Sequence, residues 1–170
     1  MRAELKQLQQ ELHSAIGNAI PSDLATGPTE KWTPCQILEH LWLSYRNTNK
    51  GLAKCMEKDE PLATSSTLTH RLKTFIVVRL GYLPTGAKAP ERATPRGVAL
   101  EEVMGSIFEE IERMDTAFAE CEQKFGRRTK LLDHPILGPL NSTEWRAFHL
   151  IHGRHHARQI RERMIRPGRT

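Results

Sequence analysis

Histidines are the residues of this sequence whose spacing best suits chemistry. There are eight, and four of them fall within eight residues near the C-terminus. At about 100° per residue, an α-helix brings His152 and His156 to one face, one turn apart. Such a pair can present two imidazole nitrogens to one metal ion. The same spacing binds zinc in metalloproteases, where glutamate follows the first histidine. Gly153 stands at that position, which excludes the protease interpretation.

A third ligand must come from another segment, and His40 is the best candidate. It lies in an apolar helix predicted over residues 37–52, with Ile37, Leu41 and Ser44 as neighbours on its face. The ring should therefore point partly into a helical bundle, where metal sites are built from facing helices. Two plainer interpretations stay open. His40 alone also fits a hydrogen-bonded core residue, and the H-x-x-x-H pair alone also fits a solvated polar face.

The other histidines are less informative. Seven residues bring His149 back to within about 20° of His156, so it could be a fourth ligand or could support one. His155 is turned away from that face, and we expect it to be exposed. The sequence names no partner for the remaining three, which are His13, His70 and His134.

Apolar residues spaced by three and four predict four long amphipathic helices, over residues 3–20, 33–57, 99–125 and 141–166. A shorter helix is predicted over residues 68–80. Capping boxes mark two of the starts, at Thr33 with Gln36 and at Asn141 with Glu144.

Between these helices the chain is irregular. Pro21 opens a loop after the first helix, residues 81–97 form a long loop rich in proline and glycine, and residues 126–141 form another. No β-type alternation of any length is found. The pattern predicts an all-α fold, a four-helix bundle with long crossover loops and one short extra helix.

The bulk composition narrows the classes of function. The 170 residues are 38% hydrophobic and 26% charged, which suits one globular domain with a core. No run approaches the ~18 apolar residues of a membrane span, and the N-terminus lacks the pattern of a signal peptide. We therefore expect a cytoplasmic protein with no membrane partner.

The net charge of +5 raises the question of nucleic acid. Arginines near the C-terminus carry most of the charge, and they suit a phosphate-binding tail or a solvated helix end. With 6% aromatic residues and no recognition motif, the sequence favours the solvated helix. The arginines are Arg154, Arg158, Arg161, Arg163, Arg166 and Arg169.

Three cysteines, Cys35, Cys55 and Cys121, are odd in number and far apart, which argues against a disulfide framework. We interpret them as small buried apolar residues. Cys35 stands apart, because the first turn of a helix lowers the pKa of a thiol.

The order of several short motifs resembles the DinB-like superfamily. Trp32-Thr33-Pro34 precedes Ile37-Leu38-x-His40-Leu41, and the last helix carries His152-x-x-His155-His156-x-x-Gln159-Ile160. The segment His134-Pro135-x-x-Gly138-x-Leu140 resembles one branch of that superfamily whose function is unassigned. The resemblance extends from the first predicted helix to about Arg163.

This resemblance implies a single DinB-like domain over residues 1–170, folded as an up-down-down-up four-helix bundle. It implies that His40, His152 and His156 bind zinc, nickel or iron, and that Gln159 packs against a ligand or supports it. Relatives include transferases and isomerases that use a low-molecular-weight thiol such as bacillithiol or mycothiol. Similar proteins often dimerise through the bundle, which implies a homodimer.

Three histidine ligands leave a coordination position open, as in catalytic sites. Our first hypothesis is a metal-dependent, thiol-dependent transferase or hydrolase acting on a small molecule. The loops 81–97 and 126–141 would border its pocket, where Lys88, Arg92 and Arg96 either meet carboxylates of a thiol cofactor or are solvated. The alternatives are a non-catalytic bundle that binds a ligand or partner, with a structural or vestigial metal, and a nucleic-acid-associated stress protein.

Overall fold

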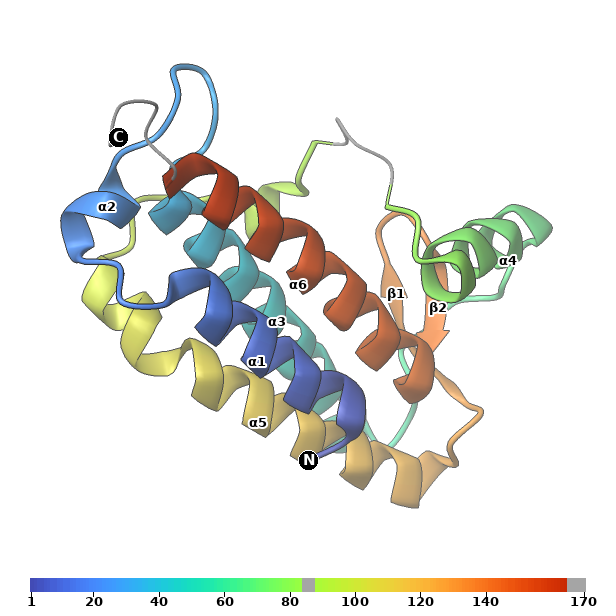
Figure 1. Cartoon of the computed structure of the whole chain (residues 1–170). Helices are drawn as coiled ribbons and strands as arrows, with labels where there is room; N and C mark the ends of the chain where they lie inside the picture. The colour runs from blue at the N-terminus through green and yellow to red at the C-terminus, as the bar shows by residue number, and fades with distance from the viewer. Residues whose placement is uncertain (84–87, 165–170) are drawn as a thin grey trace.

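The computed structural model describes residues 1–83 and 88–164, and most of this chain is helical (Figure 1). Four long helices lie side by side: α1 (Ala3–Ile16), α3 (Pro34–Lys58), α5 (Leu100–Phe125) and α6 (Ser142–Met164). The four predicted long helices are thus confirmed. The first is shorter than predicted, because Gly17 adopts a positive φ of 51° and ends it. The predicted end of the last helix, near Arg166, lies outside the described residues.

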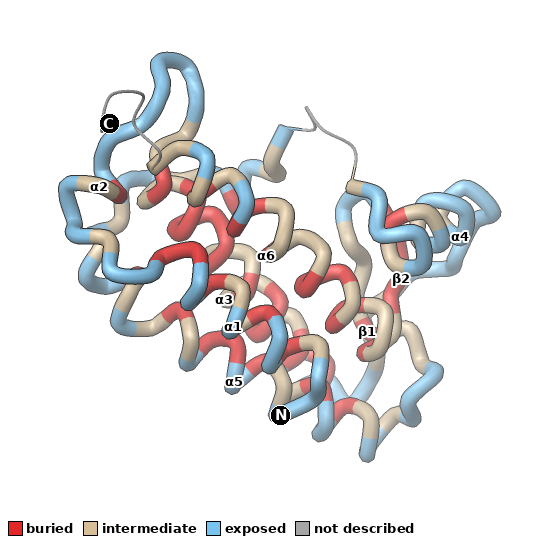
Figure 2. Tube along the Cα trace, viewed as in Figure 1, coloured by how far each residue is buried: buried red, intermediate tan, exposed pale blue. Residues whose placement is uncertain are grey.

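Two pairs of these long helices are antiparallel, and one of these pairs positions the histidines. Thr48 of α3 meets His149 of α6, whereas the earlier His40 meets the later His152, so the two helices run in opposite directions. Helix α1 runs against α5 in the same way (Figure 1). Figure 2 shows the buried residues gathered along the facing sides of these helices.

Both predicted capping boxes are present. The Thr33 hydroxyl accepts from the Gln36 backbone N–H at 3.3 Å, and the Gln36 amide oxygen accepts from the Thr33 N–H at 2.8 Å. Asn141 and Glu144 exchange the equivalent bonds at 2.9 and 2.8 Å. These caps satisfy N–H groups that a helix start leaves unpaired, and they fix where α3 and α6 begin.

Residues 126–141 correct the all-α prediction. Strands β1 (Lys130–His134) and β2 (Gly138–Asn141) form an antiparallel hairpin that packs beside α6. A register shift between Lys130 and Leu132 interrupts the pairing. Short strands with such a shift carry too little alternation to be recognised in sequence. The turn needs glycine, because Gly138 has a φ of 72°.

Shorter elements also differ from prediction. Residues Pro21–Ala25, predicted as loop, form the helix α2. The predicted helix over 68–80 is α4 (Leu68–Thr74) continued by a π-helical turn, η1 (Phe75–Arg79). The loop 81–97 contains the 3-10 turn η2 (Glu91–Ala93). No helix among the described residues is long and apolar enough to cross a membrane.

The arginines of α6 fasten it to its neighbours. Arg154 and Arg161 both pair with Glu11 of α1, at 3.3 and 3.6 Å. The Arg163 guanidinium donates to the Trp32 carbonyl in the loop before α3. Arg166 and Arg169 lie outside the described residues. Part of the basic C-terminal cluster therefore serves intramolecular packing.

Candidate metal centre

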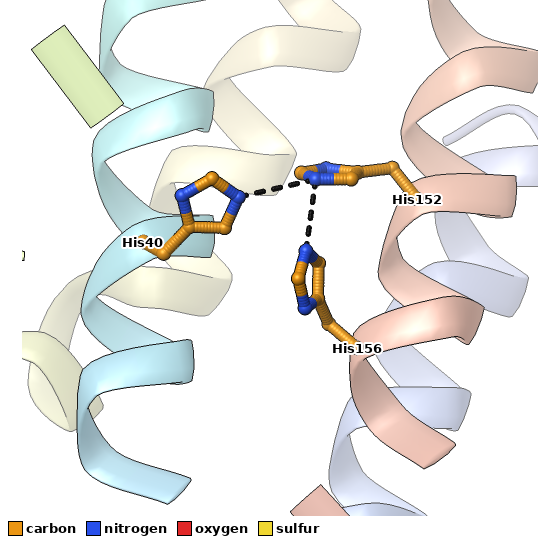
Figure 3. Close-up of side chains that lie close together, drawn as sticks. All are labelled: His40, His152 and His156. Atoms are coloured by element: carbon orange, nitrogen blue, oxygen red, sulfur yellow. Dashed lines mark hydrogen bonds between the residues drawn. The ribbon is translucent and has the colours of Figure 1, made fainter. Parts of the chain in front are cut away.

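Three histidine rings point toward one another between α3 and α6 (Figure 3). His40 comes from α3, and His152 and His156 come from α6, as the sequence predicted. Their Nε2 atoms meet: His152 Nε2 lies 3.1 Å from that of His40 and 3.0 Å from that of His156. The three nitrogens all lie within 4.8 Å of one another. The fold thus brings together residues that are 112 and 116 positions apart in the chain.

The opposite nitrogen of two rings is held by the protein. His40 Nδ1 lies 2.7 Å from the Ala93 carbonyl oxygen, which can only accept. His156 Nδ1 lies 2.8 Å from the Gln159 amide oxygen, which also only accepts. Each Nδ1 therefore carries the hydrogen, and each neutral ring presents a bare lone pair at Nε2. Gln159 thus supports a candidate ligand, the role that the resemblance implied.

This tautomer pattern leaves the centre of the cluster with more hydrogen-bond acceptors than donors. Nε2 of His152 has at most one hydrogen in a neutral ring, so it cannot donate fully to both His40 and His156. A cation at the centre would meet the Nε2 lone pairs of His40 and His156, and that of His152 when the hydrogen of this ring is on Nδ1, which has no partner among the described residues. Three nitrogens at about 2.0–2.1 Å from a tetrahedral ion stand about 3.3 Å apart. The contacts of 3.1 and 3.0 Å that His152 makes with the other two rings are close to that value, and all three nitrogens lie within 4.8 Å, so the cluster could hold a metal ion.

Burial keeps these imidazoles neutral. It lowers the pKa of His40, and together with the neighbouring His40 it lowers the pKa of His156 to about 3. Burial and then the charges of His156 and His40 hold the pKa of His152 well below its ordinary value. A metal binds the neutral ring, so the protein holds these residues in the binding form across the neutral pH range.

The cluster opens into a cavity of about 1090 Å³. Its walls include residues of both predicted loops, with Lys88, Ala93 and Arg92 from one and Leu132–Leu137 from the other. The loops therefore border the pocket, as expected. Arg96, the third cation of the loop 81–97, is not among the described residues that line the cavity.

The loop that carries Ala93 is itself anchored by a buried carboxylate that sequence reasoning missed. Glu39 is 3% exposed and accepts the backbone N–H of Arg96 at 2.6 Å and that of Gly97 at 3.1 Å. Glu39 immediately precedes His40 on α3. One turn of that helix thus positions both a candidate ligand and the loop whose carbonyl orients it.

His149 precedes the pair on α6, His155 lies between its two members, and both rings are hydrogen-bonded within the protein. The Thr48 hydroxyl donates to the Ser44 carbonyl, so His149 Nε2 donates to the Thr48 oxygen, 3.1 Å away. Nε2 of His149 thus carries the hydrogen, and the lone pair of the ring is at Nδ1, which is buried without a hydrogen-bond partner among the described residues. His155 is half-buried rather than exposed, and its Nε2 lies 3.0 Å from the Gln159 amide nitrogen. By accepting from that amide, His155 turns the Gln159 oxygen toward His156.

His134, for which no partner was predicted, organises the hairpin turn. Its Nδ1 accepts the backbone N–H groups of Ile136 and Leu137, at 3.1 and 3.2 Å. Its ring lies 4.3 Å from that of Phe148, centre to centre. Burial and the charge of Arg92 lower the pKa of His134 to about 4. The backbone bonds explain the His-Pro segment as a structural turn, and they could be found only by knowing the hairpin.

The cysteines are free. Cys55 and Cys121 are buried, as expected, and burial raises the pKa of both, that of Cys121 to about 11. Cys35 is half-buried, and its sulfur lies 3.2 Å from the Thr33 hydroxyl.

Comparison with known proteins places the chain in a family. No curated protein and no solved structure matches it. The model of the DUF1569 family, described as a protein of unknown function, matches residues 4–163. This match covers the four long helices except the first residue of α1 and the last of α6, and it includes the hairpin and the three clustered histidines. The chain therefore belongs to the DUF1569 family.

Proposed function

We propose that His40, His152 and His156 bind one divalent metal ion, which is zinc, nickel or iron. One observation carries this proposal: three Nε2 atoms converge while protein carbonyl and amide oxygens hold the Nδ1 atoms of His40 and His156. An outer partner of this kind fixes the tautomer and orientation of a ligating histidine. Imidazole is a ligand that suits all three metals.

We also propose that the four long helices form the up-down-down-up bundle of the DinB-like superfamily, in one domain. The order of the helices supports this, as does the supply of one candidate ligand by α3 and two by α6. A homodimer formed through the long helices is part of the same proposal.

The function that this site supports best is catalysis on a small molecule, as a metal-dependent transferase or hydrolase that uses a low-molecular-weight thiol. Three protein ligands leave an open position, and the cluster faces a cavity large enough for a substrate. A bound ion would polarise a carbonyl or lower the pKa of a thiol or water there. Lys88 and Arg92 line the same cavity and suit carboxylates of a thiol, while Phe148 and Leu137 form apolar wall.

A non-catalytic ligand-binding bundle is the second candidate. The carboxylates that line the cavity in the described chain are those of Glu30 and Asp133. Both oxygens of Asp133 accept the Thr64 N–H, at 3.1 and 3.2 Å. No carboxylate is thus hydrogen-bonded to the described histidine cluster as a proton acceptor for chemistry. A binder needs no such group.

The proposal is tested by the metal content of the purified protein and of matched variants. We expect one ion per chain in the native protein, and its loss in His40→Ala and in His156→Ala. His13→Ala is the control, because this exposed histidine stacks on Phe108 away from the cluster. A native protein without stoichiometric metal that also fails to bind added metal contradicts the proposal. Turnover of a thiol with a chlorinated or epoxide electrophile favours the enzyme, and stable metal without turnover favours the binder.

A further inference from the structure

An apolar ridge lies on the outside of the segment formed by α4, η1 and residues 80–82, which we call the arm. Five of the eight large apolar side chains that are exposed in the described chain belong to it. Leu68 is 81% exposed, Leu72 61% and Phe75 54%, and their spacing of four and three places them on one side of the helix. Leu80 and Tyr82 extend the exposed apolar surface. A group of this size on one element marks a binding surface.

The arm is held in place by its inner side. Val77 is 4% exposed and packs into the core, and the Thr74 hydroxyl donates to the Leu137 carbonyl of the hairpin turn at 3.3 Å. Figure 1 shows α4 standing outside the four long helices, beside the hairpin. Figure 2 shows that most of it is exposed. The arm is therefore fixed to the molecule by its inner side. The described residues that line the cavity do not include the exposed side chains Leu68, Leu72 and Phe75.

The charges of the arm select the partner. Arg71, Lys73 and Arg79 are all exposed on the arm, and Lys73 is on the side that lines the histidine cavity. Residues 61–90 contain no aspartate or glutamate. The surface thus combines exposed leucine and phenylalanine with positively charged side chains, and this segment has no negatively charged ones. Helices that lie in the headgroup region of a bilayer have this composition, because their apolar side chains enter the lipid while cations meet anionic headgroups.

We propose that the arm docks this protein on an anionic lipid surface, which departs from the expectation of no membrane partner because that expectation considered only membrane-spanning and signal segments. A second copy fits less well, because a two-fold contact would set the same patch against itself and oppose Arg71, Lys73 and Arg79 to their own copies. A ridge also suits a soft bilayer interface better than a rigid protein surface, which would need a matching groove. Lys73, Ile76 and Val77 line the histidine cavity, so docking would bring one wall of that cavity to the lipid.

Vesicle flotation of the full chain tests this proposal. We expect binding to vesicles of phosphatidylcholine mixed with phosphatidylserine, weaker binding to phosphatidylcholine alone, and release by high salt. The variant R71Q/K73Q/R79Q should bind about a hundredfold more weakly, roughly fivefold per cation. The variant L72S/F75S should lose at least about tenfold, because its side chains no longer enter the interface.

Matched controls carry the same chemical changes elsewhere. K6Q/K50Q/K54Q removes three exposed cations of α1 and α3, and I20S removes an exposed apolar side chain before α2. Both should bind as the native protein does. Equal binding to neutral and anionic vesicles, or binding that the arm variants leave unchanged, overturns the proposal. Self-association lost in L72S/F75S, without vesicle binding, overturns it in favour of a second copy. Metal content is measured in parallel and is expected to stay constant, so this test is independent of the metal proposal.

Discussion

Two groups of histidines, each with buried and half-buried members, face the same cavity, and they differ in where their nitrogens point. In the cluster of His40, His152 and His156, the Nε2 atoms face one another. In the second group, each ring is used by the fold: His134 Nδ1 accepts two backbone N–H groups, and His149 Nε2 donates to Thr48. Burial is common to both groups. Hydrogen-bond direction therefore separates a candidate ligand from a structural histidine.

The largest difference should appear in metal affinity when one member of each group is replaced in turn. His152→Ala deletes one of three proposed ligands and should weaken metal binding on the order of a thousandfold or more, beyond the 10–100-fold that outer residues typically contribute. His149→Gln leaves the cluster intact and should change affinity by no more than a few-fold. Competition with a coloured chelator measures both. Similar losses in the two variants would erase the distinction between the groups.

Low pH should lower the free energy of unfolding of the metal-free protein, and His149 of the second group should contribute to this loss. Burial, and then the charge of His134, lowers the pKa of His149 to about 3, so the folded state holds it neutral while the unfolded chain binds a proton near pH 6.5. Its contribution to stability is complete above pH 6.5 and is lost as the pH falls toward 3. Between pH 6.5 and 4 this amounts to about 3 kcal/mol.

Urea unfolding in the presence of a chelator, repeated across that pH range, measures the loss. His149→Gln should have a shallower slope, because one group that binds a proton on unfolding is gone. A slope identical to that of the native protein would mean that His149 is already charged when folded.

Replacing His134, which accepts two hydrogen bonds in the hairpin turn, should lower the stability of the fold without weakening metal binding. His134→Ala leaves the Ile136 and Leu137 N–H groups without their acceptor and removes ring packing on Phe148, a loss of about 2–3 kcal/mol. His134→Asn keeps an oxygen that can accept from the turn and should recover part of the loss. Thermal unfolding gives the stability, and chelator competition should show metal affinity within a few-fold of native in both variants.

For both groups of histidines, the sequence could predict local helical relations but not the partners that the tertiary structure brings together. Helical spacing fixes the relation of His152 to His156, and the capping box at Thr33 fixes where the helix of His40 begins. The meeting of α3 with α6 is a tertiary fact, so the cluster as a unit rested on resemblance. The roles of His134 and His149 depend on a hairpin too short to show alternation and on Thr48, 101 residues away from His149. Glu39 was missed because its partners are backbone N–H groups, which carry no sequence signal.

The smallest effect should come from the residue that supports one ligand. Gln159→Leu removes the oxygen that orients His156 and should lower metal affinity about tenfold with little change in stability. Gln159→Glu keeps an acceptor toward His156 Nδ1 and should stay close to the native affinity. If leucine and glutamate weaken binding equally, the amide oxygen does not orient the ligand.

The proposed histidine ligation is tested most directly by X-ray absorption of the protein loaded with one equivalent of zinc. We predict a first coordination shell of nitrogen and oxygen at about 2.0–2.1 Å, with the outer scattering of about three imidazole rings. The same spectrum from H40A/H152A/H156A should lose the imidazole scattering. A shell containing sulfur at about 2.3 Å, or imidazole scattering that survives in the triple variant, would contradict the assignment.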